Sequence, residues 1–208
     1  MNLRKKAGTL LLSLALALST AAGAFAQGTD AQEVLDGAEL EPQSLQSEEL
    51  GELVEETMDE LCDEEMGTYD KVAACYDYLV ENMSYGNQMR YLNVEAGDTT
   101  CADIYYDCGE VEGFAAVALT SKVGYCNGYA SALIVMLRTL GIDARLVEGE
   151  TGSANGGYAY HKWAEADIGG TTYLFDPQLE QDLTAAGLPA YSVFCKTYGE
   201  VGDRYIKY

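Results

Sequence analysis

The chain contains one histidine, His161, which lies in sequence between Cys126 and Asp176. A thiol becomes an effective nucleophile when a base removes its proton, and a third group fixes the tautomer and orientation of that base. Cysteine, histidine and aspartate can supply these three roles. Because the chain offers no second imidazole, any cysteine–histidine chemistry must use His161. We therefore select Cys126, His161 and Asp176 as candidate catalytic residues.

The expected position of Cys126 is the first turn of a helix. The cysteine follows Gly124-Tyr125 and precedes an apolar run over residues 127–140, which ends at Gly141. A glycine there is typical of a helix C-terminus, and a helix apolar on nearly every side is expected in the centre of a domain. At the helix start, unpaired N–H groups and the helix dipole favour a thiolate and can hold an oxyanion. A buried, inert cysteine is the alternative at this position.

His161 and Asp176 lie on the two arms of a predicted β-hairpin. The segments on either side of Gly169-Gly170 have a strand-like composition, and two glycines form a favoured hairpin turn. With this turn, Asp176 lies opposite Trp163 and diagonal to His161 on the same face of the sheet. Diagonal neighbours are about 7–8 Å apart at the backbone, so an Asp–His hydrogen bond is within side-chain reach. An ordinary sheet histidine and a strand-ending aspartate are the alternatives.

The hydrophobic pattern supplies the elements that must position these residues. A 3.6-residue period predicts helices from Ser47 to about Leu61 and from Thr68 or Asp70 to about Asn82. The apolar run over residues 127–140 predicts a further helix, and the short apolar segment 111–121 is interpreted as a helix, with a buried connector as the alternative. Strands are expected over residues 142–148, 158–168, 171–175, 190–196 and 204–208, and an irregular segment over 84–110. Helices followed by an antiparallel sheet indicate the α+β fold class.

Residues 1–26 have the features of a signal peptide. Basic residues at positions 4–6 precede an apolar run over 10–18 that is too short to span a bilayer, and Ala24-Phe25-Ala26 provides a cleavage site. We expect a secreted, extracellular protein that begins near Gln27 and has no membrane contact after cleavage. A retained membrane anchor is the alternative.

The chain is strongly acidic, with 34 Asp and Glu residues against 12 Lys and Arg residues and a formal net charge of −22. Such a surface repels nucleic acid and favours cationic partners, or it serves solubility alone. Residues 27–46 contain Gly, Pro and Ser, lack Lys and Arg, and show no apolar periodicity. This composition predicts an acidic disordered linker. Residues 47–208 then form one domain with its own core.

Six cysteines in an exported chain would normally indicate disulfides. If Cys126 is a free nucleophile, at most two bridges can form, and Cys101 and Cys108 are close enough in sequence to close a small loop. No CxxC pair accompanies the one histidine, so we expect no metal site and no cofactor. The many acids leave calcium open, although no EF-hand-like spacing is present.

Three segments resemble the transglutaminase-like superfamily, whose fold is related to that of papain-like cysteine peptidases. They are Gly124-Tyr125-Cys126-Asn127-Gly128-Tyr129-Ala130, His161-Lys162-Trp163-Ala164-Glu165 and Tyr173-Leu174-Phe175-Asp176-Pro177, and the similarity covers most of residues 68–208. The resemblance implies a papain/transglutaminase-like α+β core in which the helix with the cysteine packs on an antiparallel sheet with the histidine and the aspartate. It also implies that Cys126 is the nucleophile, His161 the base and Asp176 the orienting acid, with Trp163 supporting the site.

A secreted, bacterial-type member of this family would be a thiol acyltransferase or hydrolase acting on amide bonds. Attack by Cys126 gives a thioester, which a primary amine resolves by transamidation and water resolves by hydrolysis. The expected partners are a protein or peptide substrate and an amine acceptor. A cysteine peptidase or amidase of the same fold is a close alternative. A non-catalytic binding module is another, in which Cys126 would be consumed in a disulfide.

Overall fold

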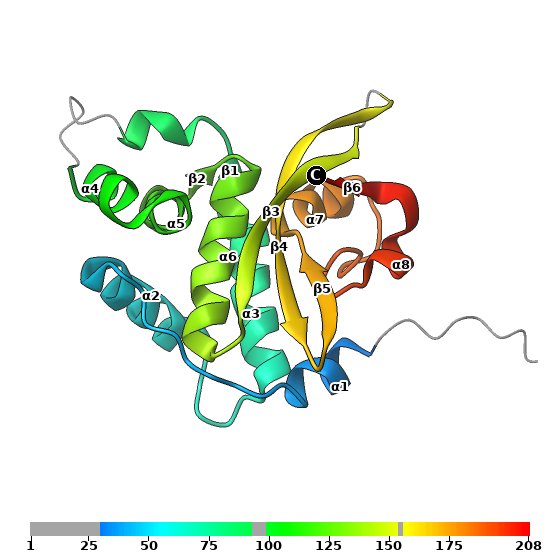
Figure 1. The fold of residues 1–208 in the computed structure, drawn as a ribbon, viewed down its shortest axis with the longest axis horizontal. Coiled ribbons are helices and arrows are strands. Elements are labelled where there is room, and N and C mark those ends of the chain that lie inside the picture. The colour runs from blue at the N-terminus through cyan, green and yellow to red at the C-terminus, as the bar shows by residue number, and fades with distance from the viewer. Residues whose placement is uncertain (1–29, 93–98, 154–155) are drawn as a thin grey trace, which may run out of the picture.

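The computed structural model describes residues 30–92, 99–153 and 156–208 (Figure 1). Its centre is helix α6 (Cys126–Leu140), which packs against a four-stranded antiparallel sheet of order β5-β4-β3-β6. The strands are β3 (Ala144–Gly152), β4 (Tyr158–Ile168), β5 (Thr171–Phe175) and β6 (Tyr205–Lys207). This arrangement confirms the predicted α+β class, with the cysteine at the start of the central helix and the histidine on the sheet.

Helices that precede α6 in the chain pack on it, namely α2 (Glu48–Leu61), α3 (Thr68–Asn82) and α5 (Glu110–Ser121) (Figure 1). Helix α4 (Thr99–Cys108) packs on α5. The predicted helix from Ser47 is confirmed, since the Ser47 side chain accepts a hydrogen bond from the N–H of Leu50. The start of α3 differs from the prediction. Neither Thr68 nor Asp70 is its N-cap, and the N–H of Tyr69 instead donates to the Asp36 carboxylate.

The expected disordered linker over residues 27–46 is wrong from Asp30 onward. Helix α1 (Ala31–Asp36) buries Leu35 completely in the core. The chain then runs along the C-terminal end of α6, where Glu41 donates to the carbonyl of Gly141. Ala31, Val34 and Ala38 are partly buried and pack against the core beside Leu35, and hydrogen bonds to α3 and α6 also hold the segment. These apolar positions follow the helical period over only about two turns, which is too short a run for the sequence analysis to have recognised. The predicted signal peptide, residues 1–26, and residues 27–29 lie outside the described residues.

The segment 84–110, expected to be irregular, contains several elements. Strand β1 (Ser84–Tyr85) pairs in parallel with β2 (Val123–Gly124), the 3₁₀ helix η1 (Gln88–Leu92) follows, and α4 packs closely on α5. The absence of a side chain at Gly113 allows this packing, because a Cβ there would clash with the backbone of Tyr105. Residues 93–98 lie outside the described part of the chain.

The C-terminal part contains two helices that the sequence analysis did not predict. Helix α7 (Pro177–Ala185) follows β5 directly, with Asp176 as its N-cap and Pro177 in its first turn. The predicted strand over 190–196 contributes one isolated bridge, between Leu174 and Lys196. Helix α8 (Tyr198–Val201) and the 3₁₀ helix η3 (Gly202–Arg204) then lead into β6.

The hairpin of β4 and β5 has the predicted register. Ile168 lies opposite Thr171, and Ala164 lies opposite Phe175. Successive side chains of β4 point to opposite faces of the sheet and so belong to two separate cores. Ala164 belongs to the large core around α6, whereas Trp163 belongs to a smaller core that includes residues of α7. Within the ranges that the structure describes, no helix is both long and apolar enough to cross a membrane.

Candidate active site

His161 and Asp176 form a buried hydrogen bond at the N-terminal half of β4. The Nε2 atom of His161 lies 2.6 Å from Oδ2 of Asp176, and the two residues are 5% and 1% exposed. The contact follows from the hairpin register, because Asp176 comes directly after the last strand residue, Phe175, which pairs with Ala164. The predicted diagonal contact is thus present.

Two further donors converge on the Asp176 carboxylate. The backbone N–H of Leu179 donates to Oδ1 at 3.0 Å and so caps α7, and the hydroxyl of Tyr205 donates to Oδ2 at 2.8 Å. Burial, and then the charge of Asp176, raise the pKa of Tyr205 well above its ordinary value, so the hydroxyl keeps the proton that it donates. Three donors from β4, α7 and β6 therefore fix the orientation of this carboxylate.

The surroundings of His161 favour its charged form. Burial lowers its pKa, but the charge and hydrogen bond of Asp176 outweigh that effect, and Cys126 adds a hydrogen bond and a charge interaction in the same direction. Together they raise the pKa of His161 to about 10. Because Asp176 engages Nε2, the nitrogen left for Cys126 is Nδ1. The three residues selected from the sequence are thus brought together around one imidazole.

Cys126 is the first residue of α6 and is half-buried. The start of this helix is held by Gln88, a fully buried residue of η1. Its Oε1 atom accepts from the N–H of Tyr125 at 3.0 Å, and its Nε2 atom donates to Oδ1 of Asn127 at 2.8 Å. Gln88 therefore binds the residues on both sides of Cys126.

Gly128 makes room for the Gln88 side chain. A Cβ at position 128 would overlap Oε1 of Gln88, so the close packing requires glycine there. The group that the Gly128 backbone approaches closely is therefore the Gln88 amide.

Sequence reasoning missed Gln88 and Tyr205. Gln88 falls in the segment that was expected to be irregular, and nothing in its neighbours distinguishes it. Tyr205 is one of 16 tyrosines and lies in a short predicted strand. The alternation of side chains along a strand places Tyr205 on one face of the predicted strand. The sequence does not show, however, that Tyr205 pairs with Thr151 of β3.

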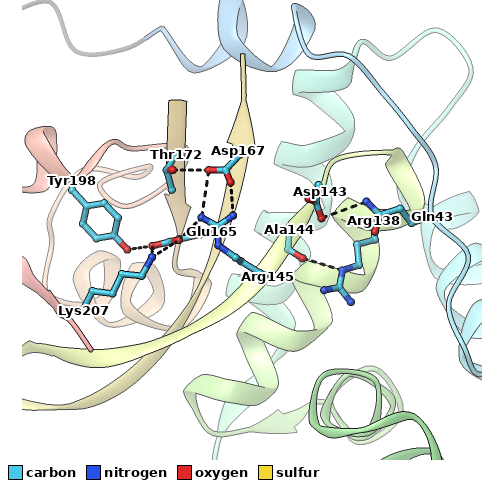
Figure 2. A network of polar contacts seen from close by, with 10 residues as sticks. All are labelled: Gln43, Arg138, Asp143, Ala144, Arg145, Glu165, Asp167, Thr172, Tyr198 and Lys207. Atoms are coloured by element: carbon cyan, nitrogen blue, oxygen red, sulfur yellow. Dashed lines mark hydrogen bonds and ion pairs between the residues drawn. The ribbon is translucent and has the colours of Figure 1, made fainter. Parts of the chain in front are cut away.

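A polar network supports the site from the same face of the sheet. The indole N–H of Trp163 donates to the Tyr198 hydroxyl at 2.8 Å, and that hydroxyl bonds to Glu165. Figure 2 shows the fully buried Glu165 between Arg145 and Lys207, each of which pairs with it at 2.8 Å. These contacts join β3, β4, α8 and β6. They hold Trp163, whose ring stacks on His161 at 6.3 Å between centroids.

Within the part of the chain that the structure describes, no cluster of three or more His, Cys, Asp or Glu side chains has an arrangement suited to a metal ion.

Exposed aromatic rings lie beside the cysteine. Tyr85 and Tyr125 are in contact, with ring centroids 5.4 Å apart. Burial, and then the charge of Cys126, raise the pKa of Tyr85.

A family model described as the transglutaminase-like superfamily matches residues 55–177, a range that includes Cys126, His161 and Asp176. YebA, an uncharacterized protein of Bacillus subtilis strain 168, is 29% identical over 110 residues. This alignment covers 47% of the chain and 13% of YebA, so the chain spans a small part of that relative.

Three solved structures show partial similarity. A proposed cysteine protease from Cytophaga hutchinsonii matches with a TM-score of 0.42 and 23% identity, over 62% of this chain and 37% of its own. A protein described as a TGase matches with a TM-score of 0.37 and 19% identity, over 62% and 30% of the two chains. A proposed protease from Parabacteroides distasonis matches with a TM-score of 0.39 and 18% identity, over 63% and 24%.

Proposed function

The chain belongs to the transglutaminase-like superfamily, and we propose that it is a thiol enzyme that cleaves an amide bond and transfers the acyl group. In this proposal Cys126 is the nucleophile, His161 the general base and acid, and Asp176 the residue that orients the imidazole. The observation that carries it is the contact of one imidazole with a carboxylate on one side and a helix-terminal thiol on the other.

The first half of the reaction forms a thioester. His161 holds the thiol proton at Nδ1, and Sγ of Cys126 attacks the carbonyl carbon of the amide. Negative charge develops on the carbonyl oxygen, where backbone N–H groups at the start of α6 would stabilise it. As the C–N bond breaks, His161 delivers the proton to the departing amine. Asp176 keeps the imidazole in the tautomer and orientation that both transfers require.

The acceptor decides the product. A primary amine that attacks the thioester gives transamidation, and water gives hydrolysis. The strongly negative chain attracts cationic amines such as a lysine side chain, which favours an amine acceptor. Tyr125 directly precedes Cys126 and its ring contacts that of Tyr85, and Tyr160 directly precedes His161. All three rings are exposed and suit contact with a protein or peptide substrate. We propose transamidation as the main reaction, in an exported protein.

The test measures both products with the chain that begins at Gln27. We expect a labelled primary amine to enter a glutamine-containing protein, with a lower rate at high salt. Cys126→Ser removes the nucleophilic thiol, and His161→Ala removes the one imidazole of the chain. Each should therefore lower the rate by at least about 10³-fold. Cys108→Ala, which changes a thiol on another helix, is the matched control and should retain the activity. Amide hydrolysis without amine incorporation would assign the peptidase alternative, and an active Cys126→Ser variant would refute the mechanism.

A further inference from the structure

Two cysteines unrelated to the proposed active site lie together between α2 and α3. Cys62 caps the C-terminal end of α2, where its N–H donates to the carbonyl of Met58, and Cys75 is fully buried in the middle of α3. The Sγ atom of Cys62 lies 4.0 Å from the carbonyl oxygen of Lys71, one helical turn before Cys75. From this geometry we propose that Cys62 and Cys75 form a reversible disulfide that joins α2 to α3, by exchange with an external low-molecular-weight disulfide.

The surface gives an oxidant access to one of these two thiols. Cys62 is half-buried and borders a surface cavity of about 380 Å³ that is also lined by Met58, Lys71 and Leu140. Cys75 has no exposed surface. An incoming disulfide therefore meets Cys62 first, and Cys75 can react only from inside the protein.

The electrostatic surroundings also favour Cys62, rather than Cys75, as the thiol that reacts first. A hydrogen bond from Cys75, assisted by the charge of Lys71 and opposed by burial and by the charges of Asp63 and Asp59, lowers the pKa of Cys62 to about 7. The same hydrogen bond, together with burial, raises the pKa of Cys75. About half of the Cys62 thiol is therefore ionised at neutral pH, and Cys75 keeps its proton and donates it in the hydrogen bond. By contrast, burial raises the pKa of Cys195, another fully buried cysteine, to about 12.

The exchange balances without any other reactant. The Cys62 thiolate attacks one sulfur of the external disulfide, its S–S bond breaks, and one thiolate leaves. Once Cys62 is a mixed disulfide it no longer carries charge, so Cys75 can lose its proton. The Cys75 thiolate then attacks Sγ of Cys62 and expels the second thiolate. The two released thiolates take up the two protons given up by Cys62 and Cys75, so two protein thiols are oxidised to one disulfide and the external disulfide is reduced to two thiols.

This pair is separate from Cys126. Leu140, which lines the cavity beside Cys62, is the last residue of α6, and Cys126 is the first. Those helix ends are about 20 Å apart at 1.5 Å per residue. The disulfide should therefore leave the reactivity of Cys126 unchanged and act on the packing of α2 against α3.

The experiment uses oxidised glutathione as the probe on the folded chain that begins at Gln27, carrying Cys126→Ser to remove the other reactive thiol. We expect the protein to lose two hydrogen atoms in mass and two titratable thiols, and a peptide map to show residues 62 and 75 joined. Cys75→Ala should instead keep glutathione on Cys62, and Cys62→Ala should leave Cys75 unmodified. Cys108→Ala is the matched control and should still form the bridge.

Three results would overturn the proposal. The first is a stable glutathione adduct on Cys62 while Cys75 is present, because Cys75 would then be unable to reach it. The second is a yield of the bridge in denaturant equal to that of the folded protein, because the pairing would then owe nothing to the fold. The third is an unmodified Cys62 in the folded Cys75→Ala variant.

Discussion

The two sides of the proposed active site are positioned in different ways. On the sheet side, His161 and Asp176 are 15 residues apart and meet through the register of one hairpin. On the helix side, Cys126 is positioned by Gln88, a residue of η1 that lies well outside the helix and binds both neighbours of the cysteine. A local rule of strand pairing is sufficient for the first contact, whereas the second depends on the tertiary fold.

The difference predicts which side tolerates change. The sheet side has redundant support, because three donors hold Asp176 and a stacked Trp163 supports the imidazole. The helix side depends on one buried amide. Loss of a supporting contact should therefore have a larger effect beside Cys126 than beside His161, and paired substitutions can test this.

The largest expected effect comes from Asp176→Asn, which acts on the residue that orients the base. The amide oxygen can still accept from Leu179 and cap α7, but the amide N–H₂ group would then face the donors of His161 and Tyr205. The imidazole would adopt the wrong tautomer, so kcat should fall by roughly 10³–10⁴-fold with little loss of helix content. Steady-state kinetics and circular dichroism measure the two effects. Asp203→Asn, an exposed change in η3, is the control.

Gln88→Ala tests the helix side. It removes both contacts to the residues around Cys126 and leaves the N–H of Tyr125 without its acceptor. We expect about 1–3 kcal/mol lower stability from the lost hydrogen bonds. The thiol should also become less well placed, with a fall in kcat/KM of about tenfold to a hundredfold. Gln32→Ala on the exposed face of α1 is the control. An unchanged rate of Cys126 alkylation in Gln88→Ala would contradict this prediction, because the start of α6 would then keep its position without Gln88.

Tyr205→Phe tests the sheet side with a smaller change. One of three donors to Asp176 is lost, so the rate should fall by only about tenfold or less, equivalent to the ~1 kcal/mol of one hydrogen bond. The charge on Oδ2 would then act more fully on His161 and raise its pKa further. Because His161 loses its proton as pH rises through that pKa, the alkaline limb of the pH–rate profile should move to higher pH.

The control for this change is Tyr158→Phe, an exposed tyrosine of β4. If Tyr205 were only a packing residue, the rate would change and the alkaline limb would stay in place. If Tyr205→Phe proved more damaging than Gln88→Ala, the contrast between the two sides would be reversed.

The parts of the fold that could be predicted are those with local causes. The register of the β4–β5 hairpin, the start of α2 at Ser47 and the end of α6 at Gly141 each follow from a few adjacent residues. The interactions of Gln88 and Tyr205 could not be predicted, since each depends on a partner from another element. The catalytic assignment of Cys126, His161 and Asp176 stays a prediction that the kinetics above must decide.

The segment around α1 shows the limit of composition as a guide. Residues 27–46 are acidic, yet Leu35 is fully buried and the backbone bonds to Gly141 and Arg138 at the end of α6. The apolar residues that pack beside Leu35 (Ala31, Val34 and Ala38) span only about two helical turns, so the composition of the whole segment concealed their pattern. The structure therefore predicts that this segment contributes to stability, against the expectation of a disordered linker.

Leu35→Ala tests this prediction and should change the catalytic rate least. Removing a fully buried leucine side chain should lower the free energy of unfolding by about 2–5 kcal/mol. The segment contacts the end of α6 that is about 20 Å along the helix from Cys126, so kcat should be unaffected while the protein is folded. Urea unfolding gives the stability, and Leu40→Ala is the matched control, because Leu40 lies in the same segment and is 43% exposed. If the two alanine variants were equally stable, residues 30–46 would behave as the linker that their composition suggests. A large stability loss for Leu35→Ala alone, with both variants equally active, would place the segment in the core and keep it apart from both sides of the site.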